Sequence, residues 1–174
     1  MLADFKPVHV VELPNCQTED GIQLYKKELL RFKKVLEDKF ETTITDEAVL
    51  HQIKLRNGIN KALRRLQYVM ANDPAPVNGL DVINTVYGSS FDINTEGLED
   101  RINAVTDKIE KEYKEGKNIG KKPRILVTGS PSGGAALKVI RAIEDNGGVV
   151  VCFENCTGMK PLAMVDEENP DVYD

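Results

Sequence analysis

The sequence has no tryptophan, only two histidines, and lysines and arginines that never cluster beyond a pair. With a net charge of −5, this composition argues against nucleic acid as a partner, because phosphate contacts need concentrated positive charge. No apolar run approaches the roughly 18 residues of a membrane-spanning helix, so we expect no membrane partner. The first residues, MLADFKPVHVVELP, have neither the basic region nor the apolar core of a secretory signal.

Cysteine is also scarce. Cys16, Cys152 and Cys156 are an odd number, without the spacing of a disulfide framework or of a complete metal site. We therefore expect a cytoplasmic protein, in which thiols stay reduced. His9 and His51 have no serine or cysteine partner at a recognisable spacing, so the sequence predicts no catalytic triad.

The N-terminal part of the chain has the apolar spacing of amphipathic helices. This spacing predicts four helices, over residues 19–40, 45–71, 80–87 and 95–115. A short apolar run at residues 8–13 predicts one strand before them. The polar residues of the long second helix are interpreted as a solvated face with pairs four residues apart; they are Arg56, Asn57, Asn60, Arg64 and Arg65.

The connector GKNIGKKP at 116–123 marks a predicted boundary, with a mainly helical region of residues 1–116 before it. Residues 123–174 are expected to start an α/β, Rossmann-like domain. Apolar runs at 124–128 and 149–153 are typical of buried parallel strands, and a glycine-rich turn and a helix lie between them. The pattern predicts a βαβ unit with a right-handed crossover, and the fold class is α/β.

Two parallel strands are not a self-sufficient core. Three alternatives would complete the sheet: the strand at 8–13 joins it, the chain is oligomeric, or the chain is cut from a longer protein. We favour the last interpretation, because the sequence ends where another helix or strand should begin.

Two polar turns follow the strands, and α/β sheets bind ligands at the carboxyl ends of their strands. Gly129–Gly134 is interpreted either as a plain strand-to-helix turn or as a loop whose backbone N–H groups hold an anion. Glu154–Gly158 is interpreted either as an Asx-type turn or as a site. We expect both turns to face one cleft. The candidate substrate-binding residues are Gly129, Ser130, Ser132, Gly133, Gly134, Glu154, Asn155, Thr157 and Gly158, and the candidate metal ligand is Cys156.

The segments RILVTGSP, GGVVV and ENCTGMKP resemble the 2-hydroxyacyl-CoA dehydratase family, the D-component of 2-hydroxyglutaryl-CoA dehydratase and benzoyl-CoA reductase. VELP, ITDEAVL and Ile53 with Arg56-Asn57 extend the resemblance over essentially the whole chain. The match at Glu154–Gly158 is the sharpest, and it is nearest the branch of the double-cubane cluster proteins. Family members are longer, with two α/β domains and an iron–sulfur cluster held between them by thiolates, and this chain resembles their middle portion.

The resemblance implies an iron–sulfur lyase or reductase subunit that works by low-potential electron transfer. An ATP-dependent activator protein would pass one electron to a 4Fe-4S cluster, which reduces a 2-hydroxyacyl-CoA to a ketyl radical before hydroxide leaves. Double-cubane relatives reduce other small molecules. The implied partners are the activator, an acyl-CoA substrate, and a homologous dehydratase subunit or a second copy in a dimer.

With three cysteines, this chain alone is expected to hold no stable cluster and to be inactive by itself. Two alternatives stay open beside the dehydratase hypothesis. One is a stand-alone anion- or nucleotide-binding α/β module that uses Gly129–Gly134. The other is an assembly or regulatory subunit that pairs with a full-length partner.

Overall fold

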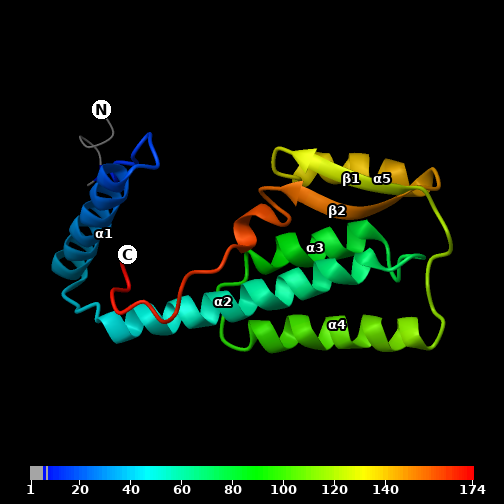
Figure 1. The fold of residues 1–174 in the computed structure, drawn as a ribbon, viewed down its shortest axis with the longest axis horizontal. Helices are drawn as coiled ribbons and strands as arrows, with labels where there is room; N and C mark the ends of the chain where they lie inside the picture. The colour runs from blue at the N-terminus through cyan, green and yellow to red at the C-terminus, as the bar shows by residue number, and fades with distance from the viewer. Residues whose placement is uncertain (1–5, 7) are drawn as a thin grey trace. The chain divides into compact units, whose positions relative to one another are not determined.

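The structure, a computed structural model, describes residues 6 and 8–174 (Figure 1). It divides into two compact units, one made of the chain up to Ile53 with Asp166–Asp174, and one made of Lys54–Val165. Helices precede a parallel βαβ unit, which confirms the α/β class. The predicted boundary at 116–123 lies within the second unit and stays a prediction.

In the first unit, α1 spans Glu19–Phe40, the predicted bounds. Thr18 caps it because its side chain accepts a hydrogen bond from the backbone N–H of Gly21, and Glu19 and Asp20 lie in the first turn. The helix ends at Glu41, which has a left-handed φ of 50°. No large apolar side chain among the described residues of this unit is buried.

The strand predicted at residues 8–13 is wrong. These residues form neither strand nor helix, and Val10 and Leu13 are 65% and 72% exposed. Side chains of α1 take up the backbone groups that a neighbouring strand would pair. Arg31 Nη2 donates to the carbonyl of Val10 at 2.8 Å, and Glu28 Oε2 accepts from the N–H of Glu12 at 3.1 Å.

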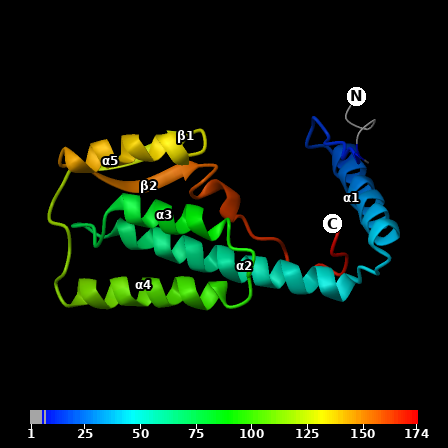
Figure 2. The same ribbon diagram turned by 180° about the vertical axis from the view of Figure 1, so that it is seen from behind.

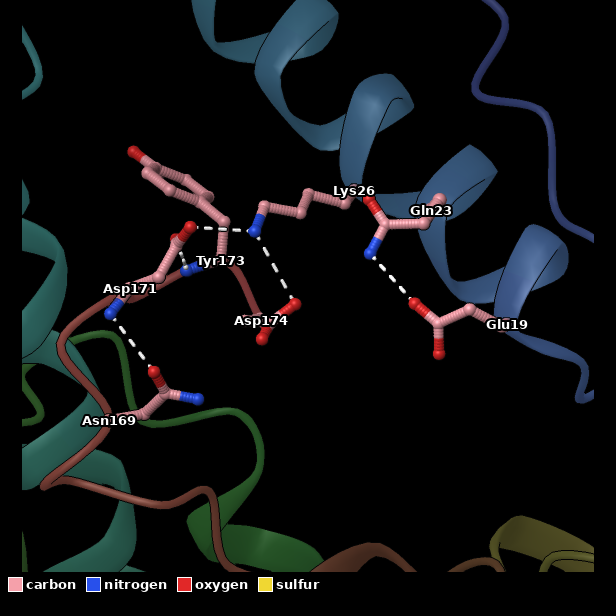
Figure 3. Close-up of polar contacts among 7 residues, drawn as sticks. All are labelled: Glu19, Gln23, Lys26, Asn169, Asp171, Tyr173 and Asp174. Atoms are coloured by element: carbon pink, nitrogen blue, oxygen red, sulfur yellow. Dashed lines mark hydrogen bonds and ion pairs between the residues drawn. The ribbon is translucent and has the colours of Figure 1, made fainter.

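The C-terminal residues also contact α1 through charged groups (Figure 3). Lys26 Nζ lies 2.6 Å from Asp171 Oδ2 and 3.3 Å from Asp174 Oδ1. The side chains of Asn169 and Asp171 accept the N–H groups of Asp171 and Tyr173, so two Asx turns shape this segment. The ammonium of Lys26 is the main cause that lowers the pKa of Asp171.

α2 spans Asp46–Tyr68 and continues into a 3₁₀ turn, η1, at Val69–Ala71, which confirms the predicted helix. In the second unit, α3 spans Gly79–Ser89 and α4 spans Leu98–Lys114. Both views show α3 between the sheet and α2 (Figures 1 and 2). The helical core is built from apolar side chains of these elements, namely Ile59, Leu63, Leu66, Met70, Val82, Ile83, Val86, Leu98 and Ile102.

β1 (Arg124–Gly129) and β2 (Val149–Asn155) are parallel, as predicted, and form a two-stranded sheet in the described part of the chain. A 3₁₀ turn, η2 (Gly134–Ala136), and α5 (Leu137–Asp145) connect them. The register pairs Thr128 with Glu154 and Gly129 with Asn155. Both strands therefore end at the same edge, and the two polar turns begin there.

Glu144 of α5 fixes the sheet to α3, which the sequence pattern did not indicate. Its Oε1 accepts the N–H of Gly79 at 2.7 Å and the N–H of Val150 at 3.2 Å, and its Oε2 accepts the N–H of Leu80 at 3.2 Å. A carboxylate thus satisfies two free N–H groups at the start of α3. α3, β2 and α5 consequently meet at one residue.

Candidate functional site

Hydrogen bonds join the two turns that follow β1 and β2. The N–H of Ser132 donates to Thr157 Oγ1 at 2.8 Å, and Asn155 Nδ2 donates to Ser132 Oγ at 2.9 Å. Ser132 and Asn155 are 4% and 0% exposed, so these bonds are shielded from water. The expectation that the topology brings Gly129–Gly134 and Glu154–Gly158 together is confirmed.

Asn155 organises the second turn as well as the link. Its Oδ1 accepts the N–H of Thr157 at 3.0 Å and the N–H of Gly158 at 2.9 Å, which is the Asx-type turn. With its Nδ2 donating to Ser132, both atoms of the buried amide are engaged. Asn155 therefore shapes the edge, and the surfaces open to a ligand come from its neighbours.

Two glycines of the site allow close approach of other groups. At Gly158, a Cβ would lie 2.1 Å from the carbonyl oxygen of Phe153, so no larger residue fits without backbone movement. At Gly133, a Cβ would lie 2.8 Å from Tyr87 Oη, so the tyrosine hydroxyl rests against the first turn. Gly133 and Gly158 are both candidate site residues from the sequence, and the structure gives a steric reason for glycine at each position.

Glu154 lies at the exposed end of β2 in a chain of polar contacts. Thr128 Oγ1 donates to its Oε2, and Lys160 Nζ lies 3.2 Å from its Oε1. The hydroxyl of Thr128, and then the ammonium of Lys160, lower the pKa of Glu154. Glu154 is thus a carboxylate whose charge Lys160 balances.

A cavity of about 290 Å³ opens beside the two turns. The first turn contributes Pro131 and the second contributes Cys156 and Thr157. Cys156 is exposed and Thr157 is half-buried. The remaining lining residues come from α2, from the end of α3 and from the segment after the second turn; they are Arg56, Leu63, Val86, Tyr87, Ser89, Ser90, Pro161 and Leu162.

The other predicted residues lie around this cavity but do not line it. Gly129 and Ser130 are exposed at the end of β1, and Gly129 has a φ of 111° that favours glycine. Gly134, with a φ of 50°, starts η2 and lines a shallow depression along α5 instead. Of the predicted site residues, Cys156 and Thr157 are therefore the two that reach the cavity.

The interpretation of the polar residues on α2 as a solvated face is wrong for two asparagines. Asn57 and Asn60 are 2% and 3% exposed. Asn57 exchanges hydrogen bonds of 2.7 and 3.0 Å with the backbone of Val165, and Asn60 Nδ2 donates to the carbonyl of Ala163 at 2.8 Å. They hold the segment that follows the second turn against α2, a tertiary contact that helical periodicity does not encode.

The sequence pattern missed the helical side of the cavity. Arg56 and Leu63 are seven residues apart on α2, so they lie on one face of the helix and reach the same cavity. Tyr87, Ser89 and Ser90 come from the end of α3. The one signal in the sequence is that Arg56 belongs, with Asn57, to the segment that extends the family resemblance; no motif marks the others.

The cysteines do not form a metal site in the described residues. Cys156 is exposed at the cavity, Cys152 is half-buried in β2, and Cys16 belongs to the other unit. Across the chain as described, no group of three or more His, Cys, Asp or Glu side chains could hold a metal ion. A cluster needs several converging thiolates, so these residues by themselves do not fit one.

A family model described as 2-hydroxyglutaryl-CoA dehydratase, D-component, matches residues 1–174. The chain belongs to this family. "Putative dehydratase subunit YjiM" of Escherichia coli (strain K12) is 41% identical over 174 residues, which are 99% of this chain and 45% of that protein. The chain thus spans less than half the length of this relative.

These matches confirm the resemblance to this family that the sequence indicates. Within the described residues, every helix is too short or too polar to cross a bilayer.

Proposed function

We propose that the chain is part of a 2-hydroxyacyl-CoA dehydratase subunit and that the edge formed by its two turns receives the acyl end of a CoA thioester. The observation that supports this most is the meeting of the two family-like turns beside one cavity, through Ser132, Asn155 and Thr157. A cavity of about 290 Å³ is at the small end for ligand pockets, so it suits a short acyl group while the CoA moiety stays outside.

Iron–sulfur chemistry and electron transfer belong to this proposal at the level of the whole dehydratase. Cys156 is the thiol best placed to contribute to a cluster, because it is exposed and lines the cavity. The other thiolates would have to come from outside the described residues. An activator protein and a homologous subunit, or a second copy, are the proposed partners.

Isothermal titration with 2-hydroxyglutaryl-CoA, compared with free CoA, tests the substrate-binding role. We expect the thioester to bind more tightly than CoA, and Thr157→Val to reduce that difference because it removes a hydroxyl from the cavity wall. Thr85→Val is the matched control, since its hydroxyl bonds within α3 to the carbonyl of Asp81. Equal affinity for thioester and free CoA would contradict the proposal.

The alternative of a free-standing anion-binding loop at Gly129–Gly134 has less support. The N–H of Ser132, at the centre of that loop, already donates to Thr157 Oγ1. An assembly or regulatory role would be favoured if the chain co-purified with a full-length homologue and bound no acyl-CoA.

A further inference from the structure

Arg56 is the one charged residue among those that line the cavity beside the two turns. The lining contains no aspartate or glutamate, although the chain as a whole carries a net charge of −5. Glu154, at the neighbouring strand end, is balanced by Lys160. The one formal charge on the wall of this cavity is therefore positive, in a chain whose net charge is negative.

The guanidinium of Arg56 is uncommitted within the part of the chain that the structure describes. Neither a hydrogen bond nor an ion pair to Arg56 is found there, and its side chain is exposed. Arg65, which lies further along α2, is different because Asp107 and Glu110 both form ion pairs with it. An arginine without a carboxylate partner at the rim of a cavity is suited to bind an anion bidentately.

Two neutral hydroxyls can add donors to that charge. Thr157 Oγ1 already accepts the N–H of Ser132, so its own hydrogen remains to donate. Tyr87 Oη lies against Gly133 at the cavity wall. The hydroxyls of Ser89 and Ser90 instead donate to the carbonyls of Val86 and Tyr87, so they do not compete for the anion.

We infer that Arg56 anchors a carboxylate of a short-chain acid in this cavity, with Thr157 and Tyr87 as hydrogen-bond donors. The inference rests on the proposed substrate-binding role and adds the class of group bound. The volume excludes a whole nucleotide or CoA and leaves room for a few carbons and a carboxylate. The apolar walls from Leu63, Val86 and Leu162 suit the methylene groups between.

Isothermal titration of the full chain with glutarate, inorganic phosphate and neutral glutaramide tests this inference. We expect glutarate to bind best. Arg56→Gln should weaken glutarate binding by about 10- to 100-fold, the loss expected for one charge-assisted hydrogen bond, and Arg56→Lys should weaken it less. Tyr87→Phe should give a smaller loss of a few fold. Lys54→Gln, the same change of charge at an exposed position of α2 outside the cavity, is the control.

Thermal melts of each variant check that the fold is kept, which the exposed position of Arg56 leads us to expect. Absent glutarate binding, or equal binding to the wild type and Arg56→Gln, overturns the inference. Phosphate bound through Arg56 in preference to glutarate also overturns it, in favour of a phosphate site. The chain could also bind glutarate through Arg56 and fail to bind the acyl-CoA. That result would uphold the inference and contradict the proposed acyl-CoA function.

Discussion

Asn155 donates a 2.9 Å hydrogen bond from its side-chain amide to Ser132 Oγ, and both residues are buried. The bond joins residues 23 positions apart, one in the turn after β1 and the other at the last residue of the parallel strand β2. Asn155 also accepts the N–H groups of Thr157 and Gly158, so its loss takes these side-chain partners from the Ser132 hydroxyl and the Thr157 N–H, while the Gly158 N–H keeps the backbone carbonyl of residue 155 at 3.2 Å.

Asn155→Ala should therefore lower the free energy of unfolding by about 2–4 kcal/mol, since unsatisfied buried groups cost about 1–3 kcal/mol each. Urea unfolding measures the change. Asn84→Ala, at an exposed position of α3, is the control and should change the stability by less than about 0.5 kcal/mol. A double-mutant cycle with Ser132→Ala should give a coupling energy of about 1 kcal/mol, and strict additivity would show that the bond contributes nothing.

Glycines at two positions should respond oppositely to the same substitution. Gly158→Ala places a Cβ 2.1 Å from the carbonyl oxygen of Phe153, and the resulting overpacking should cost about 1–3 kcal/mol. Gly88→Ala, in α3, meets no atom within 4 Å and should stabilise the protein by about 0.5–1 kcal/mol. Thermal unfolding of both variants measures the changes. If the stability of Gly158→Ala equalled that of the wild type, the close packing of the second turn would be contradicted.

The sequence predicts the helices, the two strands and the sheet edge where the two turns begin better than it predicts the cavity. The helix at Glu19–Phe40 and the parallel pair of strands follow from local periodicity and the rules of βαβ connection. Burial of Asn57 and Asn60, and the cavity position of Arg56, depend on which distant segment packs against α2. Hydrophobic periodicity and amino-acid composition do not indicate which distant segment packs against this helix.

The same limit explains the wrong strand at residues 8–13. A short apolar run at these residues favours a strand, but a strand forms only when another strand pairs with it. Here Arg31 and Glu28 bond to the backbone of that segment instead. The sequence of the segment does not reveal whether a second strand is available to pair with it.

Thr128→Val should raise the pKa of Glu154 toward the ordinary glutamate value, because the Thr128 hydroxyl is the largest cause of the lowered pKa. Lys160→Gln should also raise it, because the Lys160 ammonium lowers the pKa of Glu154 through a hydrogen bond and through its charge. Since the folded pKa lies below the unfolded one, the stabilisation is present above the ordinary value of about 4.3 and is lost as the pH falls through the folded pKa. NMR titration of the Glu154 carboxyl measures this, with Lys138→Gln on exposed α5 as the control. A pKa of Glu154 that is unchanged in Thr128→Val would contradict the contact.

The contact between α1 and residues 166–174 should depend on Lys26 and on salt. Lys26→Gln removes the ammonium that pairs with Asp171 and Asp174, so the pKa of Asp171 should rise toward its ordinary value. The lowered pKa means that the pairing is complete above the ordinary aspartate value of about 3.9 and is lost as the pH falls through the folded pKa. Because exposed ion pairs are screened, 1 M salt should act in the same direction.

Hydrogen–deuterium exchange of the amides of residues 170–174 measures the ordering of this segment. We expect faster exchange in Lys26→Gln and in 1 M salt. Lys27→Gln is the matched control, because Lys27 is the next residue of α1 and is exposed, with no ion pair to the C-terminal residues in the described chain. The segment also has its own Asx turns at Asn169 and Asp171, which do not involve Lys26. If exchange were equally slow in Lys26→Gln and Lys27→Gln, those turns would be sufficient to order the segment, and the ion pairs would have no part in it.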